Sequence, residues 1–156
     1  MADGRRATRE VVEHDDVVAV VPLLENGDLL LVRQYRLPTQ LVMLEVPAGG
    51  VDRGETPEQA AQRELAEEID RRAGRLQRLC GFYVSPGFCD EYVHVFLATE
   101  LEEASLPHDA DEDLEVVRMP LAEAVRLVYA GEIQDSKSII GLLWTAKVRG
   151  VTIEHT

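Results

Sequence analysis

The hydrophobic pattern of the first fifty residues predicts short β-strands. Val17–Leu24 is an apolar run rich in β-branched residues, and Leu29–Gln34 is a second apolar run. The Asn-Gly pair at 26–27 separates them, so we expect a β-hairpin there. A third strand, Met43–Val46, leads into the loop Pro47–Gly50.

The rest of the chain alternates between helical and extended patterns. The elements that we expect after residue 50 are a helix beginning at Pro57, strands at Leu76–Val84, Tyr92–Thr99 and Leu114–Met119, and helices at Leu121–Ala130 and Ser136–Val148. Gly131 is a suitable stop for the second helix. Strands with three helices on their faces predict an α/β sandwich. We expect one domain over residues 1–156, with 1–12 as a short N-terminal segment.

The helix that begins at Pro57 has an acidic side. Thr56 and Gln59 can form a capping box at its start. At about 100° per residue, the carboxylates of Glu64, Glu67 and Glu68 then share one face. Such a stripe repels itself unless a cation neutralises it, and hard oxygen ligands suit Mg²⁺ or Mn²⁺. The alternative is a solvated helix face without a ligand, which is the commoner outcome for acidic runs.

The neighbours of the stripe favour a metal site. Ala61, Leu65 and Ile69 form an apolar line beside the acidic line, so the helix is expected to hold the carboxylates at the edge of the core. Arg63 stands four residues before Glu67 and can orient its carboxylate by a hydrogen bond.

This segment resembles the Nudix box, a motif of the Nudix hydrolase family. The matching positions are Gly49, Glu55, Arg63, Glu64, Leu65, Glu67 and Glu68. Asp70 and Arg71 depart from the glycine and apolar residue that close the motif, so we expect the helix to end differently. The resemblance implies an α/β/α sandwich with a mixed β-sheet. It also implies that Glu64 and Glu68 are the main metal ligands, with Glu67 and the carbonyl of Ala48 as further ones, while Glu55 is structural or supports the ligands.

A second segment resembles the ADP-ribose and ADP-sugar pyrophosphatases of that family. The loop at 85–91 reads Ser-Pro-Gly-Phe-Cys-Asp-Glu, and its proline stands fifteen residues after Arg71, where that subgroup has one. The resemblance implies a substrate site that includes Arg36, Glu45, Gly87 and Glu91. Arg36 would hold the pyrophosphate oxygens, the alternative being a surface arginine, and Glu91 would contact ribose hydroxyls or a metal-bound water.

Hydrolysis needs a base, and the acidic stretch at 108–115 supplies candidates. By composition alone it is a solvated loop. By the resemblance, Glu112 is the residue that activates water or completes the metal cluster, and Glu67 and Arg63 are the other catalytic residues. Glu68 or Glu115 could take the role of base instead.

Composition limits the binding partners and the cellular location that we expect for this protein. The chain has 156 residues, 46% of them hydrophobic and 29% charged, and its formal charge of −13 argues against nonspecific binding to nucleic acid or anionic membranes. Cys80 and Cys89 lack metal-site spacing and are expected to be free thiols. Neither a signal core nor a membrane-spanning apolar run is seen, so we expect a cytoplasmic enzyme.

Taken together, the sequence predicts metal-dependent hydrolysis of ADP-ribose or a related ADP-sugar to AMP and a sugar phosphate, ribose 5-phosphate in the case of ADP-ribose. Three alternatives stay open. The substrate could be another nucleoside diphosphate sugar such as GDP-mannose, the domain could be a non-catalytic sensor of such a nucleotide, or the acidic helix could be a contact face. The resemblance also implies a homodimer.

Overall fold

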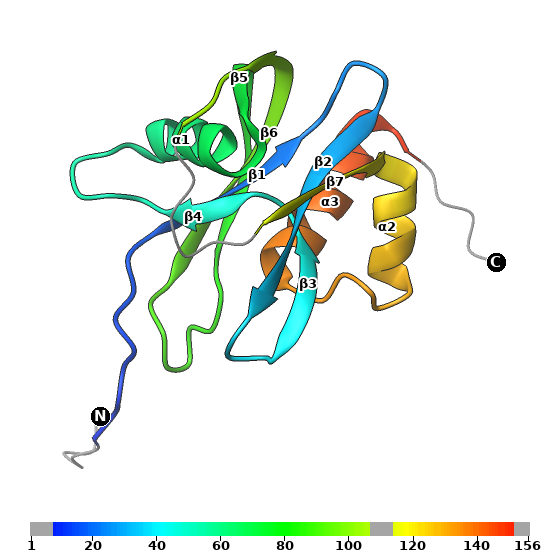
Figure 1. Cartoon of the computed structure of the whole chain (residues 1–156). Coiled ribbons are helices and arrows are strands. Elements are labelled where there is room, and N and C mark those ends of the chain that lie inside the picture. Colours follow the sequence, from blue (N-terminus) through cyan, green and yellow to red (C-terminus); the bar gives the residue numbers. More distant parts are fainter. Residues whose placement is uncertain (1–7, 107–113, 152–156) are drawn as a thin grey trace.

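The computed structural model describes residues 8–106 and 114–151. They form two β-sheets and three helices (Figure 1). The larger sheet has the order β4-β1-β6-β5 and is mixed, because β1 and β6 run parallel while the other neighbours are antiparallel. Its strands are β4 (Ala48–Gly50), β1 (Val17–Pro22), β6 (Tyr92–Glu103) and β5 (Arg71–Tyr83).

The smaller sheet is antiparallel and has the order β3-β2-β7. Its strands are β3 (Leu41–Glu45), β2 (Asp28–Arg36) and β7 (Glu115–Pro120), and the helices are α1 (Pro57–Ile69), α2 (Leu121–Tyr129) and α3 (Ser136–Arg149). Helices α2 and α3 lie together on one side of the molecule, away from α1 (Figure 1). The predicted α/β sandwich with a mixed sheet is confirmed.

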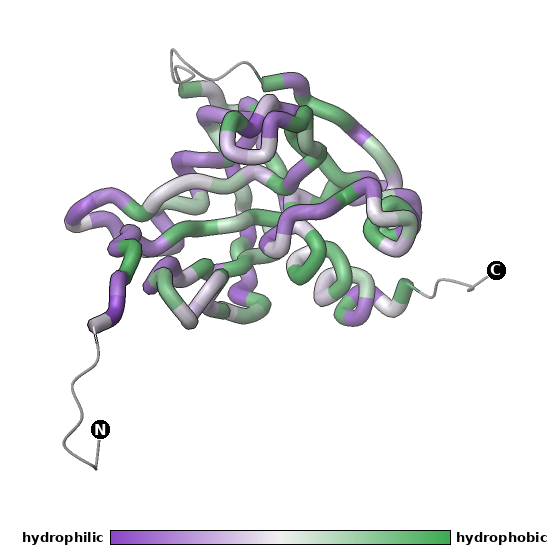
Figure 2. Tube along the Cα trace, turned by 90° about the horizontal axis from the view of Figure 1, so that it is seen from below, coloured by the Kyte–Doolittle hydropathy of each residue, from purple (hydrophilic) through white to green (hydrophobic). Residues whose placement is uncertain are grey.

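Strand β1 lies at the centre of the core because both of its faces are buried. Val18 and Val20 pack in the cluster that includes Leu65 of α1, whereas Val17, Ala19 and Val21 pack in the cluster that includes Leu142 of α3. Successive side chains of a strand point to opposite faces, so alternate residues of this one apolar run pack against α1 and against α3. Along α3, which leads to the C-terminus, hydrophobic and hydrophilic segments alternate (Figure 2).

The predicted hairpin is correct only at its turn. Gly27 adopts φ +90°, and Leu23 pairs with Leu29, but β1 and β2 then separate into different sheets. Strand β1 pairs instead with β4 and β6. A strand buried on both faces needs hydrogen-bonding partners along both edges, and a hairpin partner supplies only one.

Several strand boundaries also differ from the prediction, most of all those of β4 and β5. Ala48–Gly50, expected as part of a loop, forms β4 and pairs with β1. Strand β5 begins at Arg71, five residues before the expected start, because Arg71 pairs with Glu103 at the far end of β6. Asp70 makes this abrupt change possible by ending α1 in the left-handed conformation (φ 53°, ψ 41°).

Strand β3 begins at Leu41, two residues before the expected start, and β6 ends at Glu103, four residues after the expected end. The bounds of the other expected elements agree to within two residues. Helices α2 and α3 begin at the predicted residues, and Gly131 follows α2 with φ +73°. Cys80 and Cys89 are free thiols. Of the N-terminal segment, residues 8–12 are described, and Val12 bridges to Cys89. None of the described helices has the length and apolarity that crossing a membrane requires.

Candidate active site on helix α1

Strand β4, the loop after it and helix α1 enclose a polar pocket of about 300 Å³. Its walls include the backbone of β4 and the side chains of Arg63, Glu64 and Glu67. The site therefore forms where the two segments of the Nudix-like motif, the glycine strand and the acidic helix, face one another.

Local sequence fixes the start of α1. Thr56 Oγ1 accepts a hydrogen bond from the N–H of Gln59, and the Gln59 side chain accepts one from the N–H of Thr56, which confirms the predicted capping box. Ala61, Leu65 and Ile69 are buried against the sheet, as predicted. With both the start and the apolar side held, the acidic side of the helix has a fixed direction.

The three carboxylates of this side differ in burial. Glu64 and Glu68 are 7% and 2% exposed, whereas Glu67 is partly exposed. Glu68 Oε2 accepts a hydrogen bond from the N–H of Ala48 at 3.2 Å, so the helix is tied to the first residue of β4. Burial of a carboxylate is unfavourable unless a positive charge or hydrogen-bond donors lie next to it, so we expect a cation beside these side chains.

Arg63 supplies that countercharge. Its Nη1 donates to Glu64 Oε1 at 2.6 Å and to Glu67 Oε2 at 3.0 Å, and its Nε and Nη2 donate to the two oxygens of Glu55. Nη2 also donates to the carbonyl of Gly50 at 2.7 Å. The predicted contact between Arg63 and Glu67 is thus present, and Glu55 has the supporting position that was expected of it.

These contacts shift the pKa values of Arg63 and Glu55. The hydrogen bonds that Arg63 donates to Glu55, with further contributions from Glu64 and Glu67, raise the pKa of the Arg63 guanidinium. The hydrogen bond from Arg63 in turn lowers the pKa of Glu55, outweighing the effect of burial. Arg63 and Glu55 therefore stabilise one another in their charged forms.

The donor set fits a hard divalent cation, although its oxygens do not yet converge. Glu64, Glu67 and Glu68 offer carboxylates and Ala48 a carbonyl, which are the ligand types that Mg²⁺ and Mn²⁺ prefer. Within residues 8–106 and 114–151, no three acidic, histidine or cysteine side chains meet in a closed metal site. Arg63 holds Glu64 and Glu67, while Ala48 holds Glu68.

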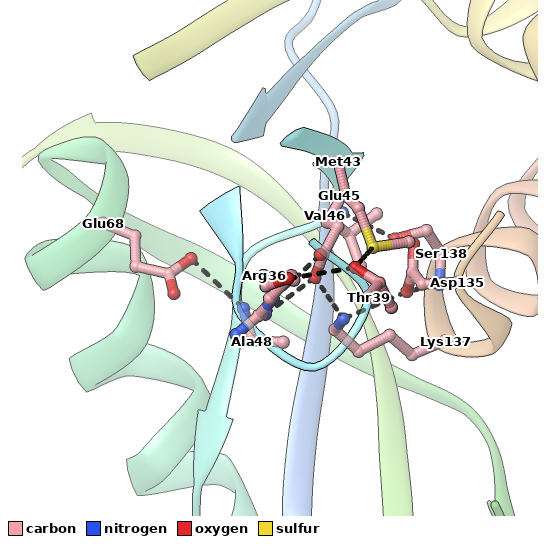
Figure 3. Close-up of polar contacts among 10 residues, drawn as sticks. All are labelled: Arg36, Thr39, Met43, Glu45, Val46, Ala48, Glu68, Asp135, Lys137 and Ser138. Carbon is pink, nitrogen blue, oxygen red and sulfur yellow. Dashed lines mark hydrogen bonds and ion pairs between the residues drawn. The ribbon is translucent and has the colours of Figure 1, made fainter. Parts of the chain in front are cut away.

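A second charged cluster brings together Arg36 and Glu45, two of the predicted substrate-binding residues (Figure 3). Arg36 donates from Nε and Nη2 to the two oxygens of Glu45, at 2.9 and 2.8 Å. Lys137 also donates to Glu45, and Asp135 accepts from Lys137 at 3.0 Å. Lys137 and Asp135 are not among the site residues predicted from the sequence, although an aspartate just before a predicted helix is a readable N-cap signal.

Burial and countercharge oppose one another at Glu45. The residue is only 1% exposed, and burial raises the pKa of its carboxyl group. Hydrogen bonds and charge from Arg36 and Lys137 lower it by more, so the pKa of Glu45 lies below its usual value. Glu45 is therefore an ionised carboxylate enclosed by two cations.

The other predicted site residues lie elsewhere or outside the described residues. Gly87 and Glu91 belong to the β5–β6 loop, whose Phe88 carbonyl accepts from the N–H of Val12 at 2.7 Å. Glu115, an alternative base, is exposed on β7 and pairs with Arg33 at 2.7 Å. Glu112 falls outside the described residues.

Comparison with known proteins places this arrangement in a family. The profile of the NUDIX domain matches residues 13–140, most of the chain. A crystal structure of an ADP compounds hydrolase superposes with a TM-score of 0.80 at 28% sequence identity, covering 88% of this chain and 75% of that one.

The curated relatives of this chain include proteins with different names. An ADP-ribose pyrophosphatase of Bacillus subtilis is 41% identical over 140 residues, 88% of this chain and 76% of the relative. A methanol dehydrogenase activator of Bacillus methanolicus is 34% identical, covering 91% and 78%. A GDP-mannose pyrophosphatase of Yersinia enterocolitica is 35% identical, covering 81% and 70%. This chain therefore belongs to the Nudix family and is a Nudix hydrolase.

Proposed function

We propose that this protein hydrolyses the diphosphate linkage of ADP-ribose or a related ADP-sugar, giving AMP and a sugar phosphate. The observation that carries the proposal is the cluster of Arg63 with Glu55, Glu64 and Glu67 beside the glycine strand β4. The choice of an ADP-sugar is supported by the 41% identity with an ADP-ribose pyrophosphatase.

Mg²⁺, or Mn²⁺ in its place, is the proposed cofactor. Glu64, Glu67, Glu68 and the Ala48 carbonyl would hold it. When bound, such ions neutralise the diphosphate and lower the pKa of water. Because Arg63 now neutralises Glu64 and Glu67, we expect binding to require that these carboxylates turn from Arg63 toward a common point.

The remaining roles are assigned to this chain's own groups. Arg36, fixed by Glu45 and 36% exposed at its side chain, binds phosphate oxygens through its guanidinium. Gly87 and Glu91 contact the sugar part of the substrate. Glu112 takes the proton of the attacking water, and Glu68 or Glu115 are the alternatives for that step.

Two other functions have a specific observation in their favour. GDP-mannose is the substrate in the name of one relative, and another relative is named as an activator of a dehydrogenase, which suits a module that controls a partner protein. A pure sensor has no need of the complete Arg63, Glu64, Glu67 and Glu68 set, so we favour the hydrolase.

A cytoplasmic homodimer is the proposed state of the protein. Four large apolar side chains of the β2–β3 hairpin are at least half exposed, namely Tyr35, Leu37, Leu41 and Val42. Exposed apolar residues that gather in one place mark contact surfaces. Free Cys80 and Cys89 fit a reducing compartment.

The test is a turnover panel in the presence of Mg²⁺ or Mn²⁺ and with a chelator. ADP-ribose, other ADP-sugars, GDP-mannose, dinucleoside polyphosphates and nucleoside triphosphates are compared, and the products are identified. We expect AMP and ribose 5-phosphate from ADP-ribose, and loss of turnover with the chelator. Preference for GDP-mannose or triphosphates would reject the ADP-sugar assignment, and no turnover of any of them would favour the sensor.

A further inference from the structure

The N-terminal end of α3 is built around Asp135. Its Oδ2 accepts hydrogen bonds from the N–H of Ser138 and from Lys137 Nζ, both at 3.0 Å. The first contact caps the helix, and the second fixes the direction of the lysine side chain. A single carboxylate therefore sets both where α3 begins and where Lys137 points.

From this helix end, two side chains reach the connection between β3 and β4. Lys137 Nζ donates to Glu45 Oε2, and the fully buried Ser138 Oγ accepts from the N–H of Val46 at 2.8 Å. At the other end of the same segment, the N–H of Ala48 donates to Glu68 of α1. Residues 45–48 are thus bound between α3 and the acidic helix (Figure 3).

The geometry at Glu45 links Lys137 to Arg36. Glu45 Oε2 accepts from both Lys137 and Arg36, while Oε1 accepts from Arg36 Nε. Both oxygens of a carboxylate must keep their direction for a two-point contact with a guanidinium. Lys137, whose side chain is 16% exposed, supplies the second charge that keeps this enclosed carboxylate in place.

We propose that Lys137 is a positioning residue for substrate binding, which acts through Glu45 to fix the guanidinium plane of Arg36 toward the diphosphate of the substrate. The proposal rests on the proposed function. Lys137 does not touch the substrate in this scheme. Its effect passes through two side chains, so its loss weakens binding of the diphosphate without removing a group that reacts.

Three variants test this role. Lys137→Met removes the charge at similar length, Lys137→Arg keeps the charge, and Lys147→Met removes an exposed lysine near the other end of the same helix. Steady-state turnover of ADP-ribose with Mg²⁺ gives KM and kcat, and calorimetric titration with ADP gives binding to a diphosphate without turnover.

We expect Lys137→Met to raise KM and the ADP dissociation constant by about tenfold or more, because Arg36 loses charge-assisted contacts with the diphosphate. The value of kcat should change by less than about threefold. Lys137→Arg should recover much of the affinity, and Lys147→Met should match the unaltered protein. Unchanged KM and ADP affinity in Lys137→Met, or a fall in kcat alone, would overturn the proposal.

Two further measurements distinguish a failure of this proposal from a failure of the variant to fold and from a failure of the proposed function. If Lys137→Met does not fold, the double variant Glu45→Gln with Lys137→Met removes both buried charges, and it should show the same loss of ADP affinity; normal affinity would overturn the proposal. If the unaltered protein hydrolyses none of the nucleotides, the proposed function fails. ADP titration then still decides whether Lys137 acts on anion binding.

Discussion

The carboxylate of Glu64 occupies the space that a side chain at Gly49 would need. A Cβ atom built on Gly49 would lie 2.1 Å from Glu64 Oε1 and 2.5 Å from Oε2. Gly49 is not in the left-handed region, so the requirement for glycine here is spatial. The glycine and the glutamate of the motif are thus two halves of one contact between β4 and α1.

Gly49→Ala is predicted to displace the Glu64 carboxylate and to lower kcat by about 100-fold, because an error of about 1 Å in a catalytic group has that effect. The fold should survive, since only the end of a side chain must move. Gly50→Ala is the matched control, because a Cβ there meets nothing within 4 Å. Kinetics and melting temperature of both variants check this; equal activity of the two would contradict it.

Glu64→Gln and Glu68→Gln should each lower kcat by about 10³-fold or more, because each removes a negative ligand from the proposed metal site. Glu58→Gln in the first turn of α1 is the control, since Glu58 is exposed. Calorimetric titration with Mg²⁺ provides a second readout. If Glu68→Gln binds Mg²⁺ as the unaltered protein does, α1 is a contact face and not a metal site.

Arg63→Met should destabilise the protein, because it leaves Glu55, Glu64 and Glu67 close together without their shared cation. We expect the free energy of unfolding to fall by about 2 kcal/mol, less than the ~3–5 kcal/mol for breaking a fully buried ion pair, because the Arg63 side chain is 25% exposed. Urea unfolding measures the change, and Arg53→Met in the exposed loop before α1 is the control. Equal stability of the two variants would mean that Arg63 is dispensable to the fold.

Helix α1 and its charged side could be predicted because their signals are local. The capping box joins Thr56 and Gln59, three residues apart, and the contact of Arg63 with Glu67 spans one helical turn. Spacing within a helix translates directly into direction, so residue order alone was sufficient to place these groups.

Strand partners and the second charged cluster depend on contacts between distant parts of the chain. Lys137 meets Glu45 across 92 positions, and β1 takes partners from β4 and β6 instead of from β2. Neither pairing leaves a local pattern in the sequence. The same holds for Gly49, whose role follows from the position of Glu64 and not from its own backbone angles.

Asp70 offers a test of the unusual end of α1. A non-glycine residue in the left-handed conformation is strained, and aspartate tolerates it better than alanine does. We therefore expect Asp70→Ala to lower the free energy of unfolding by about 1 kcal/mol. The free energy of unfolding of Asp70→Gly should equal or exceed that of the unaltered protein. Urea unfolding of the three proteins gives the order, and alanine as stable as aspartate would show that strain at this position is negligible.

Glu45 should make the stability of the protein depend on pH in the acid range. Because the pKa of Glu45 is lowered in the folded state, the unfolded chain binds the proton first as the pH falls. The contribution of Glu45 to the free energy of unfolding is therefore present above about pH 4.5, the pKa in the unfolded chain, and is lost as the pH falls through the lower pKa of the folded state. Glu45→Gln should therefore be less stable near neutrality and show a shallower loss of stability on acidification. Urea unfolding at a series of pH values from about 6 to 3 measures both slopes, with exposed Glu25→Gln as the control. Parallel slopes for the unaltered protein and Glu45→Gln would mean that Arg36 and Lys137 do not hold this carboxylate in its charged form.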